Sequence, residues 1–231
     1  MKYSKIIKGE FISRPNRFIA KVSINGKEET VHVKNTGRCK ELLIEGSTVY
    51  LAESEKNQRK TKYDLVAVEK IKDSGEKILI NMDSQAPNDA AEEWLRYNFF
   101  PENTKIRREV KFGDSRFDFY AENEREKVFI EVKGVTLEKD GLALFPDAPT
   151  IRGVKHINEL VTAKQNGFKA YILFVVQMKG VTAFAPNTET HPEFKKALKN
   201  ALENGVEILV YDCLVTPDSL TIDSPIKEIK I

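Results

Sequence analysis

Asp118, Glu131 and Lys133 have the residue types and the spacing that chemistry on a phosphodiester needs. Carboxylate oxygens are the ligands that Mg²⁺ prefers, and such sites commonly combine one or two carboxylates with phosphate oxygens of the substrate. A bound divalent cation can activate a water molecule, and a neighbouring lysine can position that water or stabilise charge on the phosphate. The three residues therefore predict a metal-dependent site for phosphodiester hydrolysis if the fold brings them together.

The segments that carry these residues have the pattern of a β-hairpin. Residues 115–121 alternate polar and apolar side chains with a period of two, and residues 127–133 do so again. The polar run at 122–126 between them is typical of a turn. We therefore expect two antiparallel strands whose side chains alternate between the two faces of a sheet.

The period of the hairpin decides whether the acidic residues meet. Glu131 and Lys133 share one face of the second strand, and a four-residue loop at 123–126 would place Asp118 directly opposite Glu131. Facing carboxylates on neighbouring strands have Cβ atoms about 4.5 to 5.5 Å apart and repel each other. A divalent cation would remove this repulsion, so the pattern predicts Mg²⁺ or Mn²⁺ as cofactor. The alternative is an exposed charged hairpin without chemistry, because 31% of the chain is charged.

Length and composition limit the classes of protein that fit. The chain has 231 residues and is 41% hydrophobic, which is enough for one large or two small domains with cores of their own. The formal net charge is +2, so any affinity for nucleic acid must come from local clusters of cations. Cys39 and Cys213 lie too far apart for a typical zinc motif or a disulfide framework. Without an apolar run long enough to span a membrane, we expect a cytoplasmic protein with no membrane partner.

The first part of the chain, residues 1–83, has the pattern of a small all-β domain. Asn25-Gly26 is a strong hairpin signal, and one short helical turn is expected at 40–43. About 80 residues of this kind suit a closed barrel, for which an OB-fold is our prediction and an SH3-like barrel is the alternative. The expected strands are residues 5–13, 17–24, 28–34, 47–53, 63–72 and 77–81.

Two polar loops of this domain, at 13–17 and 35–40, contain the residue types of a phosphate site. Backbone N–H groups in a glycine-containing turn, with arginine beside them, can bind anions, and OB barrels bind single strands with their loops and one strand face. Both loops could equally be turns whose arginines are solvated. Phe18 and Tyr50 could stack on bases, although such rings pack in cores more often. The candidate nucleic-acid-binding residues here are Arg14, Asn16, Arg17, Asn35, Thr36, Arg38 and Lys40.

Residues 84–231 predict a second domain of the α/β class with a mixed central sheet. A helix at 84–100, with Ser84 or Asn88 as its N-cap, has Trp94 on an apolar stripe that should pack against the sheet. A strand and the two arms of the hairpin follow. The other expected elements are a strand at 106–112, a helix at 154–166, a buried strand at 169–176, a helix at 192–204 and a buried strand at 206–212.

These features resemble known proteins at two levels. Asp118 with Glu131-Val132-Lys133 resembles the Asp…Glu-x-Lys core of the PD-(D/E)XK nuclease superfamily, whose common core is also helix, three strands, helix, strand. Nearly the whole chain is similar to the sugar fermentation stimulation protein family, SfsA. This resemblance implies an OB-fold domain followed by a PD-(D/E)XK nuclease-like domain, DNA binding and a regulatory link to sugar utilisation. It rests on residues 17–18, 31–39, 115–119, 130–133, 145–150, 152–156 and 205–209.

The resemblance also implies roles for individual residues. Asp118 and Glu131 would be metal ligands with the backbone carbonyl of Val132, and Lys133 would position or deprotonate the attacking water. Glu109 on the preceding strand could complete the shell of the cation, or pair with a neighbouring arginine instead. Three further residues, at the start of the helix after the hairpin, could meet phosphate or form a solvated face, and they are Arg152, Lys155 and His156.

Three functions remain compatible with the sequence. The first is a Mg²⁺- or Mn²⁺-dependent nuclease acting on DNA. The second is a non-catalytic DNA-binding regulator linked to sugar utilisation that keeps the nuclease-like fold, and the third is a barrel that acts alone as an adaptor. Two carboxylates without a cation would repel a phosphate backbone, so Asp118 and Glu131 favour the nuclease.

Overall fold

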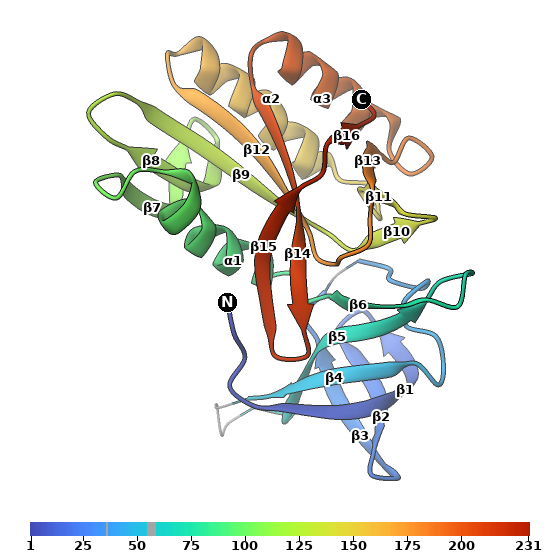
Figure 1. The fold of residues 1–231 in the computed structure, drawn as a ribbon. Coiled ribbons are helices and arrows are strands. Elements are labelled where there is room, and N and C mark those ends of the chain that lie inside the picture. The colour runs from blue at the N-terminus through green and yellow to red at the C-terminus, as the bar shows by residue number, and fades with distance from the viewer. Residues whose placement is uncertain (36, 55–58) are drawn as a thin grey trace.

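The computed structural model describes residues 1–35, 37–54 and 59–231 and shows a β-barrel packed against a larger α/β domain (Figure 1). The candidate residue Thr36 lies outside the described residues. The first strands form the barrel at one end of the molecule, and the mixed sheet with its helices forms the other. Among the described residues, no helix is long and apolar enough to cross a membrane.

Six strands make up the barrel region in the described residues, and their bounds lie within three residues of those expected. Their order is β3-β2-β1-β4-β5-β6, and β3 also pairs with β5, which closes the first five strands into a barrel with β6 attached to β5. The expected turn at 40–43 is present, because the carbonyl of Cys39 accepts hydrogen bonds from the N–H groups of Leu42 and Leu43. The strands are β1 (Ile6–Asn16), β2 (Ile19–Ile24), β3 (Lys27–Val33), β4 (Thr48–Glu53), β5 (Tyr63–Ile71) and β6 (Lys77–Asn81).

The second domain is built on a six-stranded mixed sheet with the order β15-β14-β12-β9-β8-β7. Strand β12 is parallel to both β9 and β14, whereas β7, β8 and β9 are joined as antiparallel hairpins. The predicted order of helix, three strands, helix and strand is confirmed. The elements are α1 (Ala86–Trp94) with a π-helical end η1 (Leu95–Phe99), β7 (Lys105–Phe112), β8 (Ser115–Glu122), β9 (Lys127–Val135), α2 (Ile151–Gln165), β12 (Lys169–Val176), α3 (Pro192–Glu203), β14 (Glu207–Thr216) and β15 (Ser219–Pro225).

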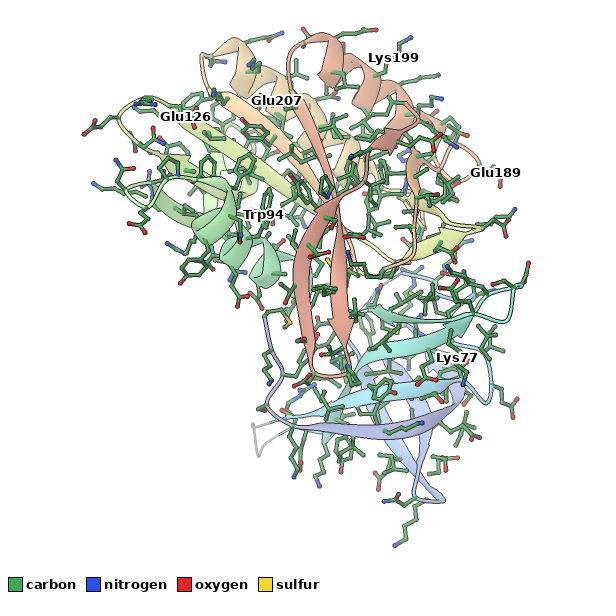
Figure 2. All side chains as sticks on the ribbon, viewed as in Figure 1. Lys77, Trp94, Glu126, Glu189, Lys199 and Glu207 are labelled. Carbon is green, nitrogen blue, oxygen red and sulfur yellow. The ribbon has the colours of Figure 1, made fainter. Side chains whose placement is uncertain are left out.

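Helices cover both faces of this sheet. Trp94 of α1 lies in one apolar cluster with Ile130 of β9, whereas Leu160 of α2 lies in another with Phe129 of β9. Since Phe129 and Ile130 are neighbours on one strand, α1 and α2 pack on opposite faces. Trp94, labelled in Figure 2, is 8% exposed, and its ring centroid lies 4.7 Å from that of Tyr211 on β14, which confirms that it packs against the sheet.

The start of α1 differs from the expectation. The N-cap is Gln85, and its side chain makes no capping hydrogen bond. The Ser84 hydroxyl instead donates to the backbone carbonyl of Lys34 in the barrel, and Asn88 points into the sheet. Ser84 and Asn88 therefore bind residues of other elements and do not cap the helix.

A small second sheet, with the order β10-β11-β13-β16, was not expected from the sequence. Its strands have two to four residues, and β13 pairs in parallel with both β11 and β16 from distant parts of the chain. Segments this short have no readable periodicity, and parallel partners far apart in sequence provide no turn signal. The strands are β10 (Leu137–Lys139), β11 (Leu142–Phe145), β13 (Ala183–Pro186) and β16 (Glu228–Ile229), and β15 was missed as well.

Buried polar contacts join the barrel to the α/β domain. Nζ of Lys70 on β5 lies 2.5 Å from the carboxylate of Glu138 on β10, and the Glu138 side chain is almost fully buried. Nε2 of Gln177 donates to both the side-chain and the backbone oxygen of Asn81, at 2.9 and 3.0 Å. These bonds and the contact of β14 with β6 hold the two parts against each other.

Candidate metal and nucleic-acid site

The hairpin has the predicted turn and register, but its ladder ends before the acidic pair. Strands β8 and β9 pair from Glu122 with Lys127 to Phe119 with Ile130. We expected Asp118 to pair opposite Glu131, but the ladder does not extend to these two residues. The carboxylate of Asp118 instead accepts a hydrogen bond of 2.8 Å from the backbone N–H of Val132.

The reason is a local break in side-chain alternation. Phe117 and Tyr120 both pack on the ring of Phe129, with centroids 5.2 and 5.0 Å away, although they are three residues apart on one strand. On the next strand Glu109 has a φ of 57°, between the pairs Arg108 with Phe119 and Val110 with Phe117. A left-handed residue inside a strand disturbs the regular pleat. Asp118 lies at this irregular point. Its side-chain carboxylate, and not a backbone carbonyl of β8, accepts the hydrogen bond from the N–H of Val132.

Asp118 is held in a largely buried position by two donors. One carboxylate oxygen accepts from Nδ2 of Asn88 on α1 at 2.8 Å, and the other accepts from Val132. Burial raises the pKa of Asp118, and the negative charge of Glu131 raises it further. Sequence reasoning overlooked Asn88, because its role depends on how α1 packs against the sheet.

Glu131 is the most deeply buried acid of the site, with 2% of its surface exposed. One of its oxygens accepts a hydrogen bond of 2.5 Å from Nζ of Lys133 and another from Nδ1 of His156. Its second oxygen is buried and has no hydrogen-bond partner in the described parts of the chain. Burial alone would raise the pKa of Glu131, but the bonds from His156 and Lys133 outweigh it, and the pKa lies below its usual range.

His156 belongs to this acidic site and not to a solvated helix face. It is 7% exposed, and its ring lies 6.4 Å from that of Phe117. Nε of Arg152 donates to Nε2 of His156 at 3.3 Å, so Nδ1 carries the proton that is shared with Glu131. The alternative of a solvated face is therefore wrong for His156, because α2 packs over β9 and turns this side chain toward the buried acid. Its contact with phosphate stays a prediction.

Glu109 and Lys155 are placed differently from the buried acids. The carboxylate of Glu109 pairs with Arg116 at 2.7 Å, with about half of its side chain exposed, which is the ion-pair alternative considered above. Nζ of Lys155 donates to the backbone carbonyl of Asp114 at 3.1 Å in the turn between β7 and β8. Arg152 and Lys155 are both exposed at the start of α2.

Three candidate residues of the barrel loops hold those loops in shape. The guanidinium of Arg14 donates four hydrogen bonds of 2.7 to 3.0 Å to backbone carbonyls, those of Arg17, Asn35, Gly37 and Arg38. The side chain of Asn16 accepts from the N–H of Phe18 at 2.9 Å, and that of Asn35 accepts from Gly37 at 2.7 Å. Arg14, Asn16 and Asn35 thus have structural partners where phosphate contacts were expected.

The remaining cations of these loops lie together at the surface. Arg17, Arg38 and Lys40 are exposed and border a cavity of about 250 Å³. The same loop lies against the α/β domain, since a Cβ on Gly37 would come within 2.1 Å of the Asp147 carboxylate. Asp147 shortly precedes α2, which carries His156. The basic loop and the acidic site are therefore connected through adjoining segments.

The donor set fits a hard cation that takes part of its ligands from elsewhere. Within the described residues, no three side chains of His, Cys, Asp or Glu form a ready metal cluster. Mg²⁺ sites, however, commonly have only one or two protein carboxylates and fill the other positions with water and substrate oxygens. The unpartnered oxygen of Glu131 beside Asp118 is the kind of acceptor that such a cation would use.

The closed barrel and the mixed sheet with its Asp…Glu-x-Lys site define an OB-fold protein with a restriction-endonuclease-like domain. Comparison with known proteins agrees: the SfsA N-terminal OB domain matches residues 12–80, and the sugar fermentation stimulation protein RE domain matches residues 85–219. The chain belongs to the sugar fermentation stimulation protein family. The barrel is thus of the OB type and not SH3-like.

Individual relatives match over almost their full length. The sugar fermentation stimulation protein homolog of Desulfitobacterium hafniense (strain DSM 10664 / DCB-2) is 56% identical over 220 residues, which cover 95% of this chain and 94% of that protein. The homolog of Clostridium beijerinckii is 55% identical over 223 residues, 96% of each chain. The structure of Pyrococcus furiosus SfsA in complex with Ca²⁺ is 29% identical, has a TM-score of 0.86, and covers 100% of this chain and 98% of its own.

Proposed function

We propose that this protein binds DNA through its barrel, residues 1–83, and hydrolyses phosphodiester bonds in its second domain, residues 84–231, with a divalent cation at Asp118 and Glu131. The observation that carries this proposal is the buried Glu131 oxygen without a partner, next to an aspartate whose pKa is raised by burial and by Glu131. The relative from Pyrococcus furiosus was solved with Ca²⁺, an ion that takes the same oxygen ligands.

Three groups of the chain would hold Mg²⁺ or Mn²⁺. Two are the carboxylates of Asp118 and Glu131, and the third is the backbone carbonyl of Val132. The N–H and C=O groups of one strand residue point toward the same neighbouring strand. Since the N–H of Val132 bonds to Asp118, its carbonyl faces the same side. When bound, the cation would neutralise the two acids and lower the pKa of a coordinated water.

The other side chains of the site orient these acids and handle charge. Asn88 fixes one oxygen of Asp118, and His156 fixes one oxygen of Glu131. Arg152 sets the tautomer of His156 from the solvent side. Lys133 balances the charge of Glu131 in this structure and would position the attacking water or stabilise the phosphate once DNA is bound.

Cations on both domains provide a path for the phosphate backbone. Arg17, Arg38 and Lys40 lie on the barrel, and Arg152 and Lys155 lie at the start of α2. Phosphates at a helix N-terminus also gain from its exposed N–H groups. The contact between Gly37 and Asp147 brings the barrel loop to the segment that leads into α2. Local clustering of this kind can bind DNA although the net charge of the chain is only +2.

A second candidate function is a non-catalytic DNA-binding regulator linked to sugar utilisation. The observation that favours it is that both oxygens of Asp118 and one oxygen of Glu131 accept hydrogen bonds from groups of the protein. In this alternative the two acids are structural, since their hydrogen bonds tie the sheet to α1 and α2. The barrel and the basic loop would then account for the whole function.

A cleavage assay separates the two functions. Single-stranded DNA, duplex DNA and RNA are incubated with wild type, Glu131→Gln and Glu124→Gln, each with Mg²⁺, Mn²⁺ or a chelator. Glu124 lies exposed in the turn between β8 and β9 and serves as the matched control. We expect wild type and Glu124→Gln to cut with metal only and Glu131→Gln to be inactive. DNA binding without cleavage under every condition would favour the regulator.

A further inference from the structure

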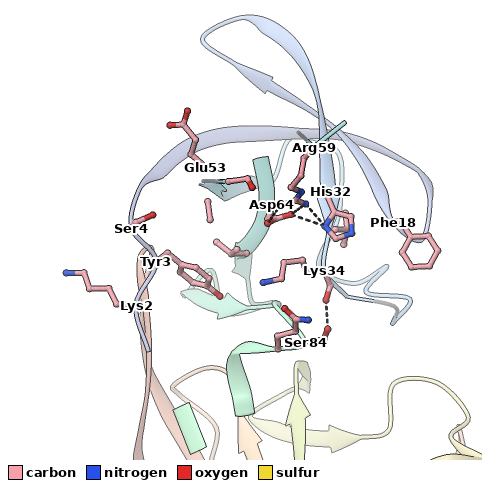
Figure 3. A pocket seen from close by; sticks show the side chains of 15 residues that line it. Lys2, Tyr3, Ser4, Phe18, His32, Lys34, Glu53, Arg59, Asp64 and Ser84 are labelled. Carbon is pink, nitrogen blue, oxygen red and sulfur yellow. Dashed lines mark hydrogen bonds and ion pairs between the residues drawn. The ribbon is translucent and has the colours of Figure 1, made fainter. Parts of the chain in front are cut away.

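A separate cavity of about 730 Å³ opens on the side of the barrel (Figure 3). Strands β3 and β5, the N-terminal segment and the chain just before α1 surround it. Pockets of roughly 300 to 1,000 Å³ hold small molecules the size of a nucleotide. This cavity is not part of the Asp118 and Glu131 site, and none of the roles above uses it.

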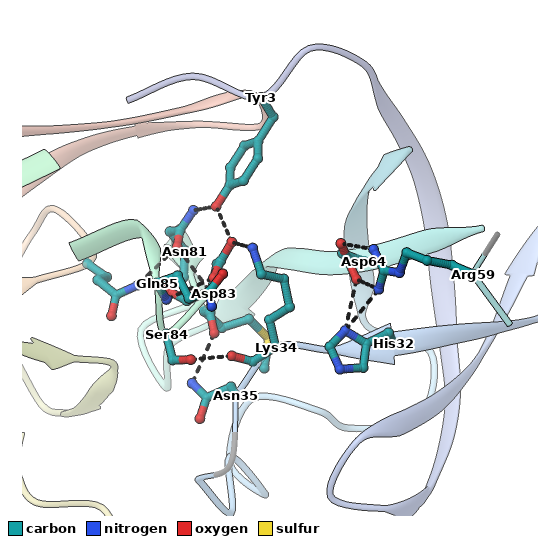
Figure 4. Close-up of polar contacts among 12 residues, drawn as sticks. Tyr3, His32, Lys34, Asn35, Arg59, Asp64, Asn81, Asp83, Ser84 and Gln85 are labelled. Atoms are coloured by element: carbon teal, nitrogen blue, oxygen red, sulfur yellow. Dashed lines mark hydrogen bonds and ion pairs between the residues drawn. The ribbon is translucent and has the colours of Figure 1, made fainter. Parts of the chain in front are cut away.

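His32 lies in this cavity with one ring nitrogen fixed. Its Nδ1 is 2.8 Å from the Asp64 carboxylate, which Arg59 also holds with two bonds of 2.6 and 2.8 Å (Figure 4). Burial alone would raise the pKa of Asp64, but the bonds from Arg59 and His32 bring it below its usual range, so the group is ionised. Because an ionised carboxylate only accepts hydrogen bonds, Nδ1 carries the proton in its contact with Asp64, and Nε2 is the ring nitrogen left for a ligand.

The cations of the cavity are already balanced by acids. Nζ of Lys34 lies 2.5 Å from Asp83, and Arg59 is paired with Asp64 (Figure 4). A phosphate would have to compete with these buried or half-buried carboxylates. The interior therefore suits a neutral polar group better than an anion.

An exposed aromatic ring stands at the rim of the cavity. Phe18 is 54% exposed and lies between β1 and β2, beyond His32 in Figure 3. Its backbone N–H is bound to the side chain of Asn16 at 2.9 Å, which fixes the turn. The preceding residue, Arg17, borders the basic cavity described above. The ring of Phe18 thus lies between the basic surface at Arg17 and the cavity at His32, whose charges are balanced.

We propose that this cavity takes an unpaired base of single-stranded nucleic acid, stacked on Phe18 and hydrogen-bonded at its edge to Nε2 of His32. Every base has a flat π-face, and a neutral base edge suits a pocket whose charges are balanced. The adjoining phosphate would lie at Arg17, on the basic side of the turn. This inference rests on the proposed nucleic-acid binding and specifies the form that is bound, because a paired base in a duplex has no free edge or face.

Fluorescence anisotropy with labelled oligonucleotides, about twelve nucleotides long to cover one OB-fold, tests the proposal. The titrations are done in chelator so that cleavage cannot interfere. Phe18→Ala should weaken single-strand binding about five- to 150-fold, the range for loss of one stacked base. Duplex binding should change by less than about twofold, as expected for an independent site. Tyr97→Ala, at a ring 81% exposed on η1, is the control and should change neither affinity.

An oligonucleotide without bases identifies the contact more directly. If Phe18 stacks on a base, the loss of binding free energy on removing the bases and the loss on removing the Phe18 ring should not add up. Both changes delete the same interaction. His32→Asn keeps an amide donor for Asp64 but deletes Nε2, and it should also weaken single-strand binding with an unchanged melting temperature. Equal affinities of wild type and Phe18→Ala for single strands, or equal losses for single strands and duplex, would overturn the proposal.

This outcome is independent of the nuclease proposal. Loss of single-strand binding in Phe18→Ala without any cleavage by wild type would support the base pocket and reject the nuclease. Metal-dependent cleavage by wild type, together with unchanged binding by Phe18→Ala, would reject the base pocket alone.

Discussion

Nδ1 of His156 hydrogen-bonds to the carboxylate of Glu131, so one buried acid fastens helix α2 to strand β9. The same carboxylate also accepts from Lys133, and its other oxygen has no partner in the structure as described. A cation that binds there must share Glu131 with a lysine and a histidine. The effects of metal on stability and cleavage, in wild type and in variants of the neighbouring residues, can therefore test the site.

Divalent metal should stabilise the fold. A ligand that binds only the native state adds about 2.7 kcal/mol to the free energy of unfolding when its free concentration is a hundredfold above its dissociation constant. We expect Mg²⁺ or Mn²⁺ to raise the melting temperature of wild type, and Asp118→Asn to lose most of this rise. Differential scanning calorimetry with metal and with chelator measures it, and Glu124→Gln should respond as wild type does. An equal rise in Asp118→Asn would place the cation elsewhere.

Removing the lysine should separate metal binding from turnover. The ammonium of Lys133 lies 2.5 Å from Oε1 of Glu131, whereas the unpartnered Oε2 is the oxygen that a cation would use. The positive charge of Lys133 therefore opposes the cation without occupying its ligand. We therefore expect Lys133→Ala to keep or increase the stabilisation by metal while cleavage falls by about 10² or more, as for loss of a transition-state contact. Lys127→Ala, at an exposed ion pair on the same strand, should retain cleavage. Full activity of Lys133→Ala would rule out its proposed role.

The dependence of DNA affinity on salt concentration should come from the exposed cations of the barrel and not from Arg14. Each phosphate neutralised contributes about 0.7 to 0.9 to the slope of log affinity against log salt. The triple variant of Arg17, Arg38 and Lys40 to alanine should reduce this slope, since these side chains are exposed at one cavity. Titrations of labelled DNA at several salt concentrations give the slopes. Replacing three lysines of α3 is the charge-matched control: Lys195 is partly exposed, and Lys196 and Lys199 are exposed. An equal reduction there would reject the assignment.

Arg14→Ala should destabilise the barrel. Its guanidinium holds four backbone carbonyls, and hydrogen bonds to charged groups contribute about 1.5 to 3 kcal/mol each, although such effects are not additive. We expect a loss of about 3 kcal/mol in urea unfolding. Arg14→Lys should be almost as unstable, because one ammonium cannot reach four divergent acceptors. Arg17→Ala is the control and should leave stability unchanged. An Arg14→Ala variant as stable as wild type would show that the loops keep their shape without the hydrogen bonds of Arg14.

The contact between the domains should depend on pH. Burial alone would raise the pKa of Glu138, but the bonds from Lys70 and Gly141 outweigh it, so the folded-state pKa is lowered from 4.5. A lowered pKa gives stability that is present above pH 4.5 and is lost as pH falls through the folded-state pKa. Glu138→Gln should thus be less stable than wild type at pH 7, by about 1.5 to 3 kcal/mol. This difference should shrink in acid, whereas Glu45→Gln, at an exposed acid, should show none.

Local patterns predicted much of the fold. The two arms of the hairpin, its turn and its register follow from alternation over a few residues, and β12 (Lys169–Val176) has the expected bounds. The helix stripes likewise depend on residues three and four apart. Such signals are local, so one sequence is enough to read them. The Asp…Glu-x-Lys spacing pointed to the site for the same reason.

The partners of the site residues were decided by packing. His156 and Glu131 are 25 residues apart, and Asn88 and Asp118 are 30 apart, so their contacts exist only once α2 and α1 cover the two faces of the sheet. The break in alternation at Asp118 likewise required a second strand, with the left-handed Glu109 beside it. Sequence by itself determined which residue types lie on which element, because periodicity acts between near neighbours. Tertiary structure alone decided which donors meet which acids, because those pairs are set by how distant elements pack.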